Sequence, residues 1–221
     1  MTKKIIFFGI WLIFLTYGFF FSPADDPETL NLIINLSSGK VEGINPLIVS
    51  LFNLMGILPM LYATMLIIDG KGQKINSAPF VVASFFVGAF ALLPYFALRE
   101  SQDNFTGEKT KLIKFLDSRF LAIILSIGAI ILLFFGLTNG NFSDFIYQWQ
   151  NSKFINIMSL DFFCLCLLFP IIIKDDLALR SQENQHNWLW WISFIPLLGA
   201  LVYLCARPPL KAGYFQSQDQ N

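Results

Sequence analysis

Charged residues are scarce in this chain. Asp, Glu, Lys and Arg make up 14% of its 221 residues, whereas a soluble domain carries about a quarter. Hydrophobic residues make up 55%, and the mean hydropathy is +0.60. Fifteen basic residues balance fifteen acidic ones, so the chain has no net positive field to attract nucleic acid. The composition therefore predicts a membrane protein and argues against nucleic-acid binding.

Residues that commonly carry catalysis or bind metals are also few. The three cysteines, Cys164, Cys166 and Cys205, lie in apolar runs without a CxxC spacing, which favours a packing role. The single histidine, His186, cannot supply paired haem ligands, and no Ser-His-Asp or ExxH arrangement is present. We therefore expect no catalytic residues and no metal site, and the sequence indicates no cofactor. It gives no evidence for or against a pigment, because chlorophyll and carotenoid can be held by apolar packing.

Long apolar runs dominate what remains. A bilayer core of about 30 Å needs roughly 20 apolar residues in a helix, and backbone groups in lipid must bond within their own segment. Six runs approach this length: residues 5–21, 46–68, 80–98, 120–137, 154–173 and 188–206. The predicted fold is an all-α, polytopic transmembrane bundle of about six spans, forming a single domain over residues 1–221 with a polar tail at 211–221.

Two connecting segments have the pattern of short helices lying at the membrane surface. Phe142, Phe145, Ile146 and Trp149 form an apolar stripe at helical spacing, which Ser143 or Asn141 could cap, and residues 29–36 could form a similar helix. The first apolar run has an alternative interpretation as a cleaved signal peptide ending at Ser22-Pro23-Ala24, but its length favours a retained helix.

Orientation and internal symmetry are not settled by the sequence. Cytoplasmic loops normally carry the excess of Lys and Arg, but six spans place seven of these residues on the amino-terminal side and eight on the other. Prolines interrupt four of the runs, at Pro59, Pro94, Pro170 and Pro196, and we expect ordinary kinks there. The halves show no convincing sequence repeat.

Asp161 is the one ionisable residue that falls well inside a run, in the stretch MSLDF. Such residues are costly in hydrocarbon, so a proton or cation site is one hypothesis and a structural hydrogen bond is the other. Asn53 lies at a similar depth on the second run. We predict that Asn53 and Asp161 form a hydrogen bond across the bundle.

Other polar and small residues suggest packing rather than chemistry. Ser84-x-x-x-Gly88 and Ala122-x-x-x-Ser126 place small residues at the spacing that allows close helix contact. Asp175 and Asp176, with Arg180 one turn on, could bind a metal and a phosphate, but a solvated helix end is simpler. Asp69 begins a predicted tight turn, and an enzyme that acts on lipid or isoprenoid would need a metal at all three acids. With six spans, Asp69 lies on the opposite membrane face from the other two acids, which disfavours an enzyme acting on lipid or isoprenoid.

Several stretches resemble a family of small multi-pass membrane proteins of cyanobacteria and chloroplasts. They are residues 45–63 (NPLIVSLFNLMGILPMLYA), 68–74 (IDGKGQK), 84–100 (SFFVGAFALLPYFALRE), 116–119 (LDSR), 158–162 (MSLDF) and 196–210 (PLLGALVYLCARPPL). The resemblance extends from about residue 25 to 210. It implies a thylakoid or plasma membrane of a photosynthetic organism, and it transfers no site residues.

Two functional hypotheses follow. The first is a non-enzymatic structural or assembly factor that contacts membrane lipids and the subunits of a larger photosynthetic, pigment-protein complex. The alternative is a transporter or channel for a small solute or ion that uses Asp161 and Asn53.

Overall fold

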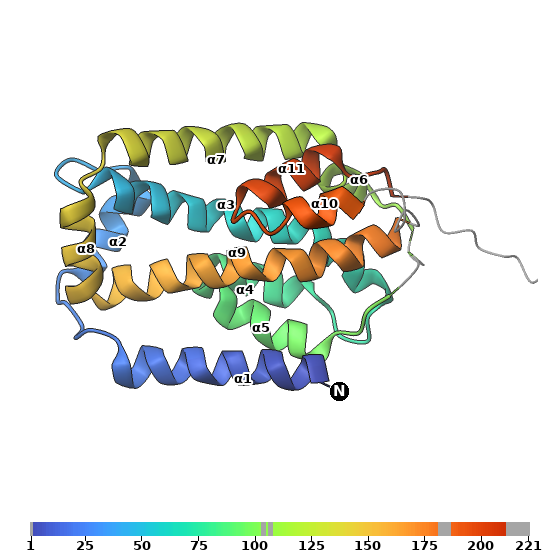
Figure 1. Ribbon diagram of the computed structural model, residues 1–221, viewed down its shortest axis with the longest axis horizontal. Coiled ribbons are helices and arrows are strands. Elements are labelled where there is room, and N and C mark those ends of the chain that lie inside the picture. Colours follow the sequence, from blue (N-terminus) through green and yellow to red (C-terminus); the bar gives the residue numbers. More distant parts are fainter. Residues whose placement is uncertain (1, 103–104, 106–107, 181–186, 211–221) are drawn as a thin grey trace, which may run out of the picture.

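The computed structural model describes residues 2–102, 105, 108–180 and 187–210, and these form helices and connecting turns without a strand among them. Four helical segments are long and apolar enough to cross a membrane, and they lie side by side along the long axis of the molecule (Figure 1). They are α1 (Thr2–Thr16) continued by η1 (Tyr17–Phe21), α3 (Pro46–Asp69), α7 (Arg119–Asn139) and α9 (Lys153–Leu179). The all-α fold is thus confirmed for the described residues, and four helical segments have the length and composition of membrane spans.

Both predicted short amphipathic helices are present. They are α2 (Thr29–Ser38) and α8 (Phe142–Asn151), and both lie at the same end of the bundle, where α8 runs across the long helices (Figure 1). Of the two proposed caps, Asn141 is the one used, because its side chain accepts a hydrogen bond from the Asp144 amide. We call this end of the bundle the helix-capped end.

The prediction of two further spans is wrong. Each of these segments is a pair of short helices, and both ends of the pair lie at the same end of the bundle. Residues 80–98 form α4 (Ala78–Val87) and α5 (Ala89–Leu98), and residues 188–206 form α10 (Asn187–Ile192) and α11 (Leu198–Ala206). The first pair begins beside the end of α3, where Ser77 lies against Gly70, and it ends there as well, where Arg99 binds Asp69. We call these pairs the re-entrant hairpins.

The hairpins reverse at about mid-depth. Gly88 separates α4 from α5 with φ 50° and ψ −123°, and Leu197 precedes α11 with φ 58°. Eleven residues separate Gly88 from Arg99, a rise of about 16 Å, which is roughly half of a bilayer core of about 30 Å. Hydropathy alone could not reveal these reversals, because two half-length apolar helices in succession have the length of one span.

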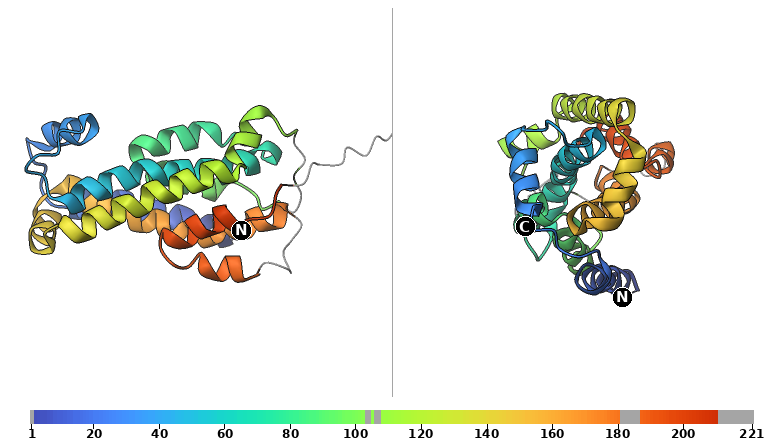
Figure 2. Two further views of the ribbon diagram at one scale, coloured as in Figure 1. Left: turned by 90° about the horizontal axis from the view of Figure 1, so that it is seen from above. Right: turned by 90° about the vertical axis from the view of Figure 1, so that its left-hand side faces the viewer.

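The two halves of the chain repeat the same arrangement, contrary to the sequence-based expectation. The order of α1 to α5 in the first half (long helix, surface helix, long helix, hairpin) recurs as α7 to α11. Viewed down the long axis, the halves are related by an approximate two-fold rotation (Figure 2, right). Corresponding long helices run in the same direction, as in transporters built from parallel repeats.

The re-entrant hairpins also change the distribution of charge. Once they are no longer counted as spans, the helix-capped end retains only Lys40 and Lys153 of the Lys and Arg residues that the structure describes. The rest lie at the opposite end, hereafter the basic end: Lys3, Lys4, Lys71, Lys74, Arg99, Lys109, Lys111, Lys114, Arg119, Lys174, Arg180 and Arg207. If the bundle lies in a membrane, the positive-inside rule predicts that the basic end faces the cytoplasmic side.

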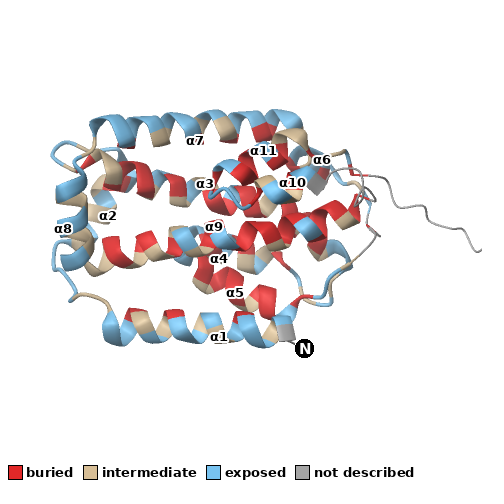
Figure 3. Ribbon diagram, viewed as in Figure 1, coloured by how far each residue is buried: buried red, intermediate tan, exposed pale blue. Residues whose placement is uncertain are grey.

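The buried residues line the faces that the long helices turn toward one another, while the outer faces of α1 and α7 are exposed (Figure 3). One proline has a specific partner. Pro94 lacks an amide proton, so the carbonyl of Phe90 loses its helical donor, and the indole Nε1 of Trp11 on α1 donates to that carbonyl at 3.0 Å. Phe14 stacks on Phe90 at 4.2 Å and completes the contact between α1 and α5.

Candidate functional site: a lateral groove at the basic end

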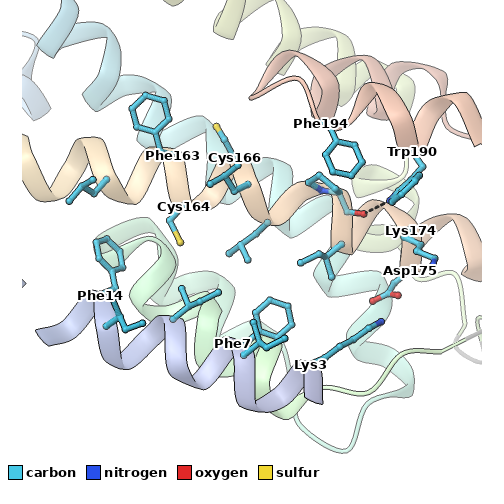
Figure 4. A pocket seen from close by; sticks show the side chains of 18 of the residues that line it. Lys3, Phe7, Phe14, Phe163, Cys164, Cys166, Lys174, Asp175, Trp190 and Phe194 are labelled. Carbon is cyan, nitrogen blue, oxygen red and sulfur yellow. Dashed lines mark hydrogen bonds between the residues drawn. The ribbon is translucent and has the colours of Figure 1, made fainter. Parts of the chain in front are cut away.

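A groove of about 850 Å³ lies between α1, α9 and α10 (Figure 4). Most of its lining is aliphatic or aromatic. Its volume lies within the range of about 300 to 1,000 Å³ that is typical of small-molecule sites. The described residues that line it are Lys3, Ile6, Phe7, Ile10, Ile13, Phe14, Tyr17, Leu160, Phe163, Cys164, Cys166, Leu167, Leu168, Pro170, Ile171, Lys174, Asp175, Trp190 and Phe194.

Comparison of the two halves shows why the groove exists. The two-fold relation pairs the seam between α1 and α9 with the seam between α7 and α3. The α7–α3 seam is closed, because Gly136 packs against Ser50 and Gly128 against Ile57, while Ser50 donates a hydrogen bond to the Leu132 carbonyl at 2.7 Å.

The α1–α9 seam closes near the helix-capped end alone. There the Tyr17 hydroxyl donates to Asn156 Oδ1 at 2.9 Å, and Gly18 lies beside Ile157. Toward the basic end α1 packs on α5 instead, and the groove opens between α1 and α9. One copy of the repeated seam is thus sealed by small residues, whereas the other is left open.

A second, more polar cavity of about 430 Å³ adjoins the groove at the basic end. The two cavities share four lining residues, Lys3, Phe7, Ile171 and Asp175, so they are adjacent. The rest of the polar cavity is lined by Lys4, Phe96, Arg99, Glu100 and Ser101. A mostly apolar groove therefore borders a charged chamber at the basic end.

Buried ion pairs form the wall of this chamber. Arg99 is 7% exposed and makes a two-pronged contact with Asp69, through Nε to Oδ2 at 2.9 Å and Nη2 to Oδ1 at 2.6 Å. Its Nη1 donates to Asp175 at 2.5 Å, and the hydroxyl of Tyr95 donates to Asp69 at 3.1 Å. Arg99 thereby joins the ends of α3, α5 and α9.

The second half contains the corresponding arrangement. Tyr203 and Arg207 have the same four-residue spacing as Tyr95 and Arg99, and both donate to Asp176 near the end of α9. Arg180 also binds Asp176, through Nε at 2.9 Å, and reaches Asp117 at 2.8 Å. Each hairpin is thus fastened to the long helix of its own half by a Tyr–Arg pair on one aspartate.

Arg99 and Arg180 remain charged. Burial works against the guanidinium charge of each, but the bound carboxylates, Asp69 for Arg99 and Asp176 for Arg180, raise each pKa above its ordinary value. The sequence-based expectation of a solvated helix end is wrong for Asp175 and Asp176, because both side chains are buried. The assignment of Asp69 to the opposite face is also wrong. Within the described residues, no group of acids, cysteines and histidines is placed to hold a metal ion.

Asp161 is buried at the turn of the first hairpin. Its Oδ1 accepts a hydrogen bond from the Ala89 amide at 2.6 Å, so it caps the first turn of α5. The predicted bond to Asn53 is not formed. Asn53 lies on the exposed face of α3 and donates instead to the Val49 carbonyl of its own helix at 2.8 Å.

The predicted small-residue faces have mixed outcomes. Gly88 forms the hairpin turn and also lies closely against Asp161 of α9, whereas Ser84 donates to the Val81 carbonyl of its own helix α4. Ala122 is buried, and Ser126 lies 3.4 Å from Cys205, so this pair contacts α11 as an internal packing face. The polar tail at 211–221 and His186 lie outside the described residues.

Sequence reasoning missed Lys3, Lys174 and Arg99 as site residues. The repeated Tyr-x-x-x-Arg pattern, at Tyr95 to Arg99 and Tyr203 to Arg207, was the available signal, because it places two polar side chains on one face at the end of an apolar run. Comparison with family models, curated proteins and solved structures finds no match to the chain.

Proposed function

We propose that this protein binds a lipid-like amphiphile in the lateral groove between α1 and α9. The observation that carries the proposal is that the apolar groove lies directly beside the charged chamber at the basic end. An amphiphile needs this pairing, because its chain gains from apolar contact while its head must stay hydrated or ion-paired. The open seam adds support, because the same chain closes the equivalent seam in its other half.

The test is to identify what co-purifies with the protein. Lipid extracted from protein purified in a neutral detergent and analysed by mass spectrometry should contain an amphiphile in a fixed ratio to protein. Ile10→Trp, which fills the groove, should lower that ratio, whereas Leu12→Trp, which lies on the same helix outside the groove with similar exposure, should not. Equal lipid content in both variants would contradict the proposal.

The membrane setting is part of the same proposal. The resemblance to cyanobacterial and chloroplast proteins favours a thylakoid or plasma membrane of a photosynthetic organism, in which the protein would act as a non-enzymatic factor beside a larger pigment-protein complex. Tagged purification from native membranes in a mild detergent should then recover photosystem or pigment-protein subunits. A protein that runs alone would remove this part of the proposal and leave amphiphile binding untouched.

Movement of an ion or small solute is the second candidate. It is favoured by the two re-entrant hairpins and by Asp161 at the turn of one of them, because transporters place substrate sites at interrupted helices near mid-depth. Asn53 contributes nothing to this candidate, since its side chain faces outward. Asp161→Asn should abolish flux into proteoliposomes, and Asn53→Ala should leave it unchanged. Equal flux in the two variants would refute this candidate.

A further inference from the structure

Six charged residues surround the end of the groove and the adjoining chamber, and most of them are already paired. Arg99 binds Asp69 and Asp175, while Lys4 lies 3.6 Å from Glu100. Lys4 thus offsets the charge of Glu100, and Arg99 offsets one of the two negative charges of Asp69 and Asp175. The contacts of Arg99 also fix the chamber wall, since Arg99 and Asp175 are both buried.

Two ammonium groups have no such partner among the described residues. Lys3 on α1 and Lys174 on α9 both line the groove, both are exposed, and neither makes an ion pair with a described carboxylate. Figure 4 shows them at the same end of the groove, beside Asp175. They come from the two helices that form the open seam, so a ligand there would meet one positive charge from each side.

The apolar part of the groove has the dimensions of a long chain. Its lining on α1 runs from Lys3 to Tyr17, a rise of about 21 Å, or about two thirds of the hydrocarbon core. Trp190 stands at the wall, where its indole Nε1 donates to the Pro170 carbonyl at 3.0 Å. No charged side chain lines the groove beyond its basic end.

We infer that the ligand is an anionic amphiphile, whose negative head is held between Lys3 and Lys174 and whose long acyl or prenyl chain lies along α1. This inference rests on the proposed function and specifies its ligand class. The head would lie in the leaflet at the basic end. This is the leaflet where anionic lipid heads attract basic side chains, if the basic end is cytoplasmic.

The experiment compares chain-matched probes by native mass spectrometry of the full-length protein in a neutral detergent. The probes are a lysophosphatidylglycerol, a free fatty acid and a lysophosphatidylcholine. We expect both anionic probes to bind at least about tenfold more tightly than the zwitterionic one, a ratio equivalent to about 1.4 kcal/mol. Preference for the phosphate probe alone would assign a lipid headgroup as the ligand, and preference for the fatty acid would assign a free carboxylate.

Variants locate the preference. The double variant Lys3→Gln, Lys174→Gln should abolish the preference for anionic probes, and Lys3→Arg, Lys174→Arg should keep it. The control Lys71→Gln, Lys74→Gln removes two exposed charges at the same end but outside the groove, so it should also keep the preference. Equal binding of all three probes, or a preference that survives the first double variant, would overturn the anionic assignment. Binding unaffected by Ile10→Trp would instead overturn the groove itself, so the two failures are distinguishable.

Discussion

Gly88 is the position at which the first hairpin can be tested most sharply, by the substitution Gly88→Ala. Its φ of 50° and ψ of −123° are strained for any residue with a Cβ. A Cβ placed there would also lie 2.5 Å from the Cγ of Asp161, which must move and release the Ala89 amide. The backbone strain costs about 1 to 3 kcal/mol. Loss of a hydrogen bond to a charged group adds about 1.5 to 3 kcal/mol.

The combined loss of about 2.5 to 6 kcal/mol is a large part of an ordinary unfolding free energy of about 5 to 15 kcal/mol. For a chain of this size it should lower the unfolding midpoint by roughly 5 to 24 °C. The assay is thermal unfolding in detergent, followed by reaction of a thiol-reactive dye with Cys164, Cys166 and Cys205, which are free and shielded to different degrees.

The matched control is Gly56→Ala on α3, where a Cβ would meet nothing within 4 Å. This substitution should leave the midpoint unchanged or raise it slightly, because alanine is the better helix former by about 1 kcal/mol. Asp161→Ala should cost less in the Gly88→Ala background than in the unmodified protein, because the hydrogen bond to the Ala89 amide is already lost there. Equal midpoints for Gly88→Ala and Gly56→Ala would refute the assignment of a tight turn at this position.

Three further predictions concern the basic end and the docking of α1. Arg99→Ala leaves two buried carboxylates without a cation, so it should cost about 3 to 5 kcal/mol in thermal unfolding, while Lys74→Ala at the same end should cost nothing measurable. Trp11→Phe leaves the carbonyl of Phe90 without a donor, and it should lower stability by about 1 to 3 kcal/mol while a Trp11→His rescue is only partial. A single cysteine replacing Lys40 should react with an impermeant thiol reagent from outside intact cells, whereas one replacing Lys74 should not; the reverse pattern would contradict the orientation.

The long helices and the two surface helices could be predicted from the sequence because their signals are local. A long apolar run in lipid must be helical, because its backbone groups have to bond within the segment, although it can be one span or two half-length helices. The spacing of Phe142 and Phe145 with the Asn141 cap defines α8 without reference to the rest of the chain. The burial of Asp161 was also predictable from its place inside such a run, although its partner was not. The Asn53 side chain donates its hydrogen bond to the Val49 carbonyl one turn earlier in its own helix. The periodicity of the sequence does not reveal this alternative.

The error in topology had one cause with several consequences. When residues 80–98 are counted as a span, every later loop is assigned to the wrong side of the membrane. The assignment becomes correct again only after residues 188–206, which are miscounted in the same way. That reversal moved Arg99, Lys174 and Arg180 to the wrong face and produced the undecided tally of seven against eight. The same reversal separated Asp69 from Asp175, although Arg99 binds both. The point at which a hairpin turns back depends on tertiary contacts, such as that between Asp161 and the turn at Gly88. A hydropathy profile contains no information on such contacts.

The internal repeat supplies the strongest argument that the groove is a built feature. The two-fold relation makes the α1–α9 seam equivalent to the α3–α7 seam. If both seams were open, the groove would follow from the architecture alone. The α3–α7 seam is instead closed by glycines and by a hydroxyl bonded to a helix carbonyl, so the fold is able to close it. In the open seam, Phe163, Leu167 and Ile13 occupy the surface and are exposed. Replacing residues that close one seam should therefore cost stability, whereas replacing those that line the other should change ligand binding first.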